Sequence, residues 1–140
     1  MNLLVNIDVE DLEKATRFYC EALGLRIGRR FEGSVELLGS DVPIYLLENA
    51  AGTQAFSGGK KRDYERHWTP VHLDFAVTDL GRAVARAKAA GALLERDIEA
   101  KSWGRIAVFS DPFGNGFCLL EFTGRGYDEI TLKDPGRGPA

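Results

Sequence analysis

The chain has 140 residues, a net formal charge of −3 and two cysteines. This length predicts one compact domain without disulfides, and the scattered Lys and Arg residues exclude the basic stripe that nucleic acid requires. Met1 and Asn2 lead directly into an alternating pattern without a basic leader, and no apolar run approaches the ~20 residues that span a bilayer. We therefore expect a cytoplasmic protein with neither a nucleic-acid nor a membrane partner.

The first half of the chain predicts one strand, one helix and three further strands. Apolar and polar residues alternate over positions 3–9, which indicates a strand with Asn6 and Asp8 on one face. Asp11 is a suitable N-cap for a helix that ends at Gly24, because apolar residues follow at spacings of three and four. Three short strands are expected near residues 26–31, 34–38 and 43–48.

The second half repeats this order after a Gly-rich, charged loop at residues 49–69. An alternating strand at 71–77 is followed by the capping residue Asp79, a helix that ends at Gly91, and strands near 93–98, 105–110 and 117–122. The segment Asp111-Pro112-Phe113-Gly114-Asn115 predicts a tight turn between the last two strands.

The two halves match in register. Val9, Asp11 and Leu12 recur as Val77, Asp79 and Leu80, each 68 positions later. We therefore predict an α+β fold of two tandem βαβββ modules, each a curved mixed sheet with one helix on its convex face. The two uncovered concave faces would join to form a cup-shaped pocket.

Several short motifs stand out along the chain. They are Val9-Glu10-Asp11-Leu12, Phe18-Tyr19, Leu23-Gly24-Leu25, His72, Trp103-Gly104 and Asp111-Pro112-Phe113-Gly114-Asn115. Together they resemble the vicinal oxygen chelate superfamily, which includes glyoxalase I, bleomycin-resistance proteins and extradiol dioxygenases. The resemblance implies one domain over residues 1–123, with module one at 2–49, a linker at 50–69, module two at 70–123 and a C-terminal tail at 124–140.

The resemblance also implies four positions where metal-dependent members carry their ligands. In this chain they are Leu4, Tyr45, His72 and Cys118, of which only His72 matches the usual choice. Glu48 and Glu121 lie three residues beyond Tyr45 and Cys118, and an odd separation along a strand directs their side chains to the opposite face. We therefore expect no metal and no other cofactor in the cup.

Seven residues are candidates for ligand binding in the cup. A pocket-wall histidine is favoured over a metal ligand for His72, and a small buried side chain is the simpler interpretation of Cys118. Polar residues on the inner faces indicate either a wet pocket or a water-filled module interface, and Trp103, like Trp68, either forms an aromatic wall or covers a sheet edge. The candidates are Asn6, Asp8, Tyr45, His72, Asp74, Trp103 and Cys118.

Two functional hypotheses follow from the resemblance. The first is a bleomycin-resistance-like protein that binds a small organic molecule, aromatic or heterocyclic, without a metal and without transforming it. The alternative is a metal-dependent lyase, isomerase or dioxygenase whose ligands are re-sited around His72, with Cys118, Asp74 or Asp8 in place of the usual carboxylates. In either case we expect a homodimer in which each cup combines module one of one chain with module two of the other.

Overall fold

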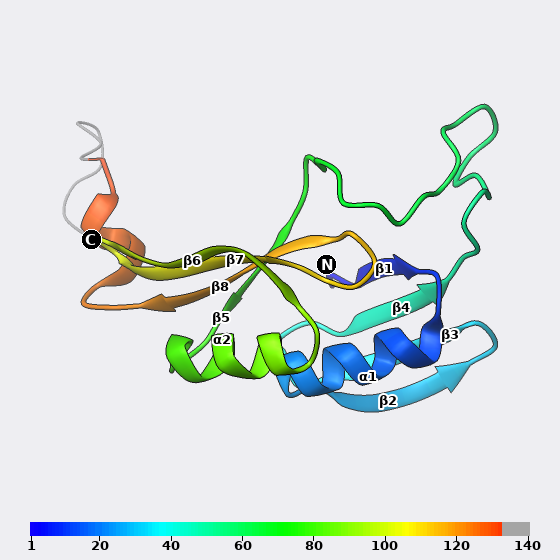
Figure 1. The fold of residues 1–140 in the computed structure, drawn as a ribbon. Helices are drawn as coiled ribbons and strands as arrows, with labels where there is room; N and C mark the ends of the chain where they lie inside the picture. Colours follow the sequence, from blue (N-terminus) through cyan, green and yellow to red (C-terminus); the bar gives the residue numbers. More distant parts are fainter. Residues whose placement is uncertain (133–140) are drawn as a thin grey trace.

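The computed structural model describes residues 1–132, which form two four-stranded sheets, each with one α-helix (Figure 1). The first module runs through β1 (Val5–Val9), α1 (Leu12–Leu23), β2 (Arg26–Phe31), β3 (Ser34–Leu38) and β4 (Ile44–Glu48). The second module runs through β5 (Leu73–Ala76), α2 (Leu80–Ala89), β6 (Leu93–Lys101), β7 (Gly104–Ser110) and β8 (Gly116–Phe122), and a 3₁₀ helix, η1 (Gly126–Ile130), follows it.

The two sheets have the same topology. Their strand orders are β1-β4-β3-β2 and β5-β8-β7-β6, and in each the first strand pairs in parallel with the last. The register places Asn6 beside Tyr45 in module one and Asp74 beside Cys118 in module two. The predicted fold class, two βαβββ modules with curved mixed sheets, is therefore confirmed.

Each helix begins at the predicted capping residue. The side chain of Asp11 accepts a hydrogen bond from the backbone N–H of Lys14 at 2.9 Å, and Asp79 accepts one from Arg82 at 3.0 Å. A glutamate at the end of the last strand of each module adds a second carboxylate at the same helix end. These acceptors satisfy N–H groups that the helix itself leaves without partners.

The turn between β7 and β8 is organised by the buried carboxylate of Asp111. Its Oδ1 accepts hydrogen bonds from the backbone N–H groups of Phe113 and Asn115, both at 2.8 Å. Gly114 adopts a φ of 80°, which a residue with a Cβ atom rarely adopts. The predicted hairpin is confirmed, and its backbone amides are satisfied within the turn.

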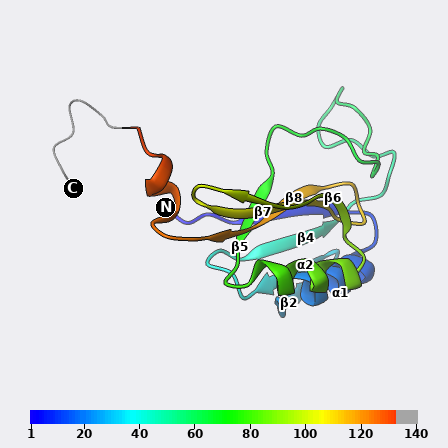
Figure 2. The ribbon, with the colours of Figure 1, turned by 60° about the vertical axis from the view of Figure 1, so that its left-hand side comes forward.

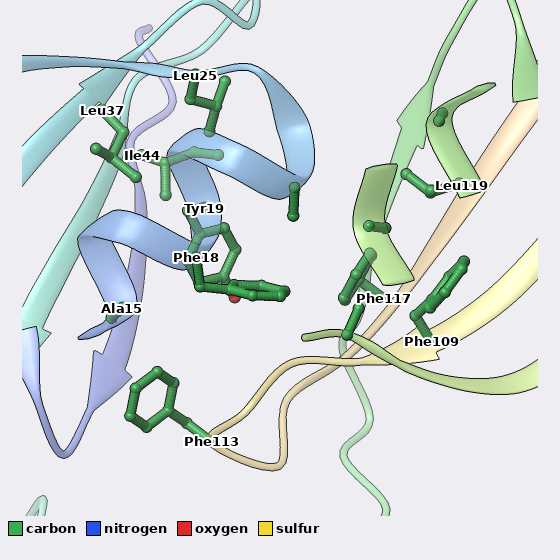
Figure 3. Close-up of a cluster of buried hydrophobic side chains, with 14 of the residues drawn as sticks. Ala15, Phe18, Tyr19, Leu25, Leu37, Ile44, Phe109, Phe113, Phe117 and Leu119 are labelled. Carbon is green, nitrogen blue, oxygen red and sulfur yellow. The ribbon is translucent and has the colours of Figure 1, made fainter. Parts of the chain in front are cut away.

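The two modules meet through their helix-covered faces. α1 and α2 lie side by side in both views of the ribbon (Figures 1 and 2) and contact each other. Phe18 of α1 reaches the side of module two, where its ring centroid lies 6.5 Å from that of Phe117 (Figure 3). The Tyr19 hydroxyl donates a buried hydrogen bond of 2.6 Å to Oδ2 of Asp111. One continuous core therefore joins the modules and leaves the other face of each sheet uncovered by helices.

Three strands differ from their predicted ranges by more than one residue. β1 begins at Val5 and β5 at Leu73, because the ladder with β4 starts at Ile44 and the ladder with β8 starts at Phe117. The residues just before these starts alternate as a strand does but have no strand partner. β6 continues to Lys101, because its pairing with β7 extends to Lys101 and Gly104, on either side of the hairpin turn.

The connection between the modules is tied to both of them. Tyr64 donates to the backbone carbonyl of Asn49, and its ring packs edge-on against Phe113 in module two. A short antiparallel bridge between Gln54 and Lys61 gives its first half the shape of a hairpin that projects from the molecule (Figure 1). Within the described residues, neither α-helix has the length and apolar character of a membrane span.

Candidate functional site

Three of the predicted binding residues converge on the uncovered face of module two. His72 and Asp74 are two residues apart at the start of β5, and Cys118 is the direct cross-strand partner of Asp74. Their donor atoms all lie within 4.8 Å of one another, and Nε2 of His72 is 3.1 Å from Oδ1 of Asp74. His72 and Asp74 are exposed, whereas Cys118 is buried. The cluster therefore presents an imidazole and a carboxylate to the cup, with a thiol beneath them.

The thiol of Cys118 is held in its protonated form. Burial raises its pKa to about 11, and the neighbouring Asp74 carboxylate adds to this shift by its charge and by a hydrogen bond. Arg96 acts in the opposite direction from the outer part of the same sheet face. Since the nucleophilic form of cysteine is the thiolate, this environment opposes a reactive cysteine at neutral pH.

Tyr45 lies on the corresponding face of module one, in a network that sequence reasoning missed. Its hydroxyl donates to Oε1 of Glu36 at 2.8 Å and accepts from Nη2 of Arg29 at 3.0 Å. Arg29 also binds the Glu36 carboxylate through Nε, Nη2 and its backbone N–H. These donors, with Arg29 first, lower the pKa of Glu36 to about 2. Tyr45 is therefore fixed in position by an ionised, enclosed carboxylate.

The signal for this network is present in the sequence. Glu36 is the only charged residue of β3, and it stands between Val35 and Leu37 on the face opposite to theirs. Gly28 makes room for it, because a Cβ atom there would lie 2.5 Å from Oε2 of Glu36. A lone acid in an apolar strand opposite a glycine is the pattern that could have identified the site.

Asp8 is occupied by the connection between the modules. Its Oδ2 accepts from Nε of Arg62 at 2.8 Å, and its Oδ1 accepts from Nδ2 of Asn49 at 3.0 Å. Arg62 is therefore held against module one, and its side chain is only 18% exposed. A carboxylate already paired with a guanidinium is a poor metal ligand, because the cation competes for its oxygens.

A pocket of about 490 Å³ lies between the unpaired edges of β1 and β5. Asn6, Asp8 and His72 contribute polar groups to a wall that is otherwise largely apolar. A neighbouring pocket of about 440 Å³ continues along the same edges and includes Asp74. Neither includes Tyr45 or Cys118, which lie further along the concave sheet faces.

Trp103 lies apart from the other candidates, in the turn between β6 and β7. Its ring packs at 5.1 Å from that of Tyr127 in η1 and at 6.0 Å from that of Phe122. It also borders a small hollow of about 120 Å³ on the concave face, together with Arg96, Ile106 and Val108. Trp103 therefore covers the end of the sheet and reaches the outer part of this face, whereas Trp68 is 82% exposed.

The four-position metal set of the superfamily does not fit these residues. Leu4 precedes β1 and has no donor atom, and the Tyr45 hydroxyl is already bound to Glu36 and Arg29. Glu48 and Glu121 lie on the helix side, as predicted: Glu48 accepts from the N–H of Leu12 at 2.9 Å, and Glu121 accepts from that of Leu80 at 2.7 Å. Among the described residues, the only grouping of three His, Cys, Asp or Glu donors close enough to hold an ion is His72, Asp74 and Cys118.

Comparison with known proteins agrees with this architecture. Residues 4–120 match the family model described as a glyoxalase-like domain. The chain belongs to this family. This glyoxalase-like family and the paired βαβββ modules together place the protein in the wider glyoxalase, bleomycin-resistance and dioxygenase superfamily. A search of curated protein sequences found no match.

Solved structures share the fold at low sequence identity. The fosfomycin resistance protein FosX from Listeria monocytogenes has a TM-score of 0.71 and 19% identity, over 94% of this chain and 98% of that one. Hypothetical protein SA1046 from S. aureus has a TM-score of 0.67 and 23% identity, over 86% and 96%. A glyoxalase/bleomycin resistance protein/dioxygenase from Nocardioides has a TM-score of 0.65 and 18% identity, over 99% and 89%. These likenesses establish the fold alone.

Proposed function

We propose that this glyoxalase-like protein binds a small organic molecule in the cup between its βαβββ modules, without a metal and without transforming it. The observation that carries the proposal is the pocket of about 490 Å³ beside His72. Its volume is within the range of small-molecule sites, and it combines an apolar wall with a few polar groups, as such sites do. The two free cysteines agree with a reducing compartment, and we propose a cytoplasmic location.

The same proposal includes a homodimer with two cups, each formed by module one of one subunit and module two of the other. Among residues 1–132 of one chain, β1 has β4 as its only strand partner and β5 has β8, so each of these two strands leaves one sheet edge unpaired. Exposed apolar side chains surround these edges, among them Leu3, Trp68 and Val71. A second copy would cover both features, and Asn6 and Tyr45 of one subunit would then face His72, Asp74 and Cys118 of the other. Closure of the cup within one chain is the rival arrangement, and the pocket of about 490 Å³ agrees with it, because Asn6 and His72 of the same chain both line that pocket.

A second candidate function is favoured by the close approach of His72, Asp74 and Cys118. Imidazole, carboxylate and thiolate together suit zinc better than magnesium or manganese. A bound ion at these residues would supply Lewis-acid chemistry to a lyase, isomerase or dioxygenase. In that case Nε2 of His72 and the Asp74 carboxylate, whose Oδ1 lies 3.1 Å from it, would both offer donor atoms to the ion.

Elemental analysis and mass spectrometry of the purified protein separate these two candidates. We expect no stoichiometric divalent ion, and we expect an organic molecule that is released on denaturation and is lost from His72→Ala. His67→Ala is the matched control, because His67 is the other histidine of the chain and lies in the exposed connection. One ion per chain that is lost in His72→Ala but kept in His67→Ala would replace the first candidate with the second.

A further inference from the structure

The concave face of module two carries a row of four residues that runs across all four strands. In order from the outer edge, Arg96 pairs with Val108, Val108 with Cys118, and Cys118 with Asp74. Three strand spacings place the two charged ends of the row roughly 14 Å apart at their Cα atoms. Arg96 borders the hollow of about 120 Å³ on this face, and both charged groups are close enough to Cys118 to shift its pKa.

Module one has the corresponding row, but its arginine is neutralised. There Arg29, Glu36, Tyr45 and Asn6 follow one another across the sheet, and Glu36 binds Arg29 directly. Both arginines lie where their strand departs from regular register. In module two Val108 stands where module one has Glu36, so the carboxylate that neutralises the arginine of module one is replaced by an apolar side chain.

The other acids near Arg96 are engaged elsewhere. Glu95 is bound by Arg66, and Glu99 is bound by Lys101. Asp97 borders the same hollow, and its carboxylate accepts the backbone N–H of Ile98. Within residues 1–132, Arg96 takes part in no ion pair of 4.0 Å or less. It is exposed and remains available to an anion.

The opposite end of the row has the opposite character. The Asp74 carboxylate is exposed, and its Oδ1 lies 3.1 Å from Nε2 of His72. Val108 lies between the two ends of the row and forms an apolar floor with Ile106, its neighbour on β7. Trp103 borders the same hollow from the turn between β6 and β7. Both charged ends act on the thiol between them, since Asp74 raises the pKa of Cys118 and Arg96 lowers it.

We infer that the cup of this protein takes a small zwitterionic molecule, with an anionic group on Arg96, an amine on Asp74 and a flat apolar body on the floor between them. This inference rests on the proposed function and extends its site along the concave face, because Asp74 borders the pocket of about 440 Å³ that continues from the one beside His72, whereas Arg96 borders the separate hollow of about 120 Å³. Each group of the molecule meets its electrostatic complement, and opposite charges at fixed separation orient the ligand in one direction only.

Four probes that share one ring test the inference by isothermal titration calorimetry. They are 4-(aminomethyl)benzoate with both charges, 4-methylbenzoate with the anion, 4-methylbenzylamine with the cation, and neutral 4-methylbenzyl alcohol. We expect the doubly charged probe to bind at least about fivefold more tightly than either singly charged probe, since each charged contact contributes on the order of 1 kcal/mol.

Single variants assign each charge to its residue. Arg96→Gln should weaken the binding of 4-(aminomethyl)benzoate and 4-methylbenzoate about fivefold or more and leave that of 4-methylbenzylamine unchanged. Asp74→Asn should weaken the binding of 4-(aminomethyl)benzoate and 4-methylbenzylamine by a similar factor and leave that of 4-methylbenzoate unchanged. Arg82→Gln is the control, because Arg82 is an exposed arginine on α2, which covers the other face of the sheet.

Each remaining outcome has a defined meaning. Equal binding of the neutral and doubly charged probes, or an Arg96→Gln protein that binds all four like the wild type, would overturn the zwitterion inference and leave the proposed cup function standing. Failure of all four probes to saturate at millimolar concentration would overturn the inference. If no organic molecule is released from the purified protein either, the proposed function fails with it.

Discussion

Cys118 has a predicted chemical behaviour that follows from its position beneath Asp74. With a pKa of about 11, only about one molecule in 10⁴ carries the thiolate at pH 7, compared with a few per cent for an ordinary thiol. In a Cys20→Ser background, alkylation by iodoacetamide should therefore be slow at pH 7 and accelerate toward pH 11. Mass spectrometry of the modified protein against time gives the rate.

Two neighbouring substitutions should move this profile in opposite directions. Asp74→Asn removes the charge and the hydrogen bond that raise the pKa of Cys118, so the pH at which the alkylation rate is half its maximum should fall. Arg96→Gln removes a charge that lowers that pKa, so the midpoint should rise. Rapid, pH-independent alkylation of the parent protein would show that the thiol lies outside the environment described for it.

The buried carboxylates act on structure in different ways. Glu36 is neutralised by Arg29 inside one module, whereas Asp111 accepts the Tyr19 hydroxyl of the other module. Burial, followed by the charge of Asp111 and its hydrogen bond, raises the pKa of Tyr19 well above its ordinary value. The tyrosine therefore stays a neutral donor, which is the form that the contact between modules requires.

At the scale of elements, the β7–β8 turn is expected to be sensitive to a methyl group added at Gly114. A Cβ atom at Gly114 would lie 2.6 Å from the backbone oxygen of Glu65, in the connection that crosses the turn. Gly114→Ala therefore combines an unfavourable positive φ with a collision between two backbone segments. We expect it to cost about 3 kcal/mol or more of unfolding free energy, measured by urea denaturation.

Gly33→Ala separates these two contributions. Gly33 has a φ of 70°, close to the 80° of Gly114, and no atom lies within 4 Å of its added Cβ. The control should lose only the conformational part, about 1 kcal/mol. Equal losses of unfolding free energy in Gly33→Ala and Gly114→Ala would show that the added methyl group at Gly114 does not collide with the connection.

Elements far apart in sequence also support each other at the helix ends. The N–H groups at the start of α1 and α2 receive carboxylates from Glu48 and Glu121, which belong to the last strand of the same module. A negative group at a helix N-terminus is favoured by the helix dipole. The repeated glutamates therefore fasten each helix to its sheet, which explains why they are absent from the cup.

At the scale of the whole molecule, the exchanged homodimer makes a clear prediction. Val71 is 75% exposed in the single chain, at the edge that a second copy would cover. Val71→Lys should therefore produce a folded monomer, because the charge is costly only in the interface. Light scattering over a dilution series should give a dimer for the parent and half that mass for the variant.

The ligand-binding state of the variant decides how the cups are built. Leu132→Lys is the matched control, since Leu132 is 89% exposed beyond η1 and should leave the dimer intact. In the exchanged arrangement, the Val71→Lys monomer should lose binding of 4-(aminomethyl)benzoate together with its dimer. A monomer that keeps full binding would show that one chain closes its own cup.

The sequence by itself determined the elements, the repeat and the faces of the sheets. Caps at Asp11 and Asp79, alternation along the strands and the Asp111 turn are local effects, because each depends on residues within a few positions. The same alternation correctly directed Glu48 and Glu121 away from the cup. It also placed His72, Asp74 and Cys118 on one face, although the register that brings them together required the parallel pairing of β5 with β8.

Only the tertiary structure decided which side chains meet. The partner of Asp8 is Arg62, 54 positions away, and it arrives by the path of a long connection that no local pattern specifies. Arg29 reaches Glu36 because β2 departs from regular register between Ile27 and Arg30. Such an irregularity shifts which side chains lie opposite one another, and alternation alone does not locate it. The paired and unpaired arginines of the two modules, and with them the charge pattern of the cup, are therefore properties of the fold.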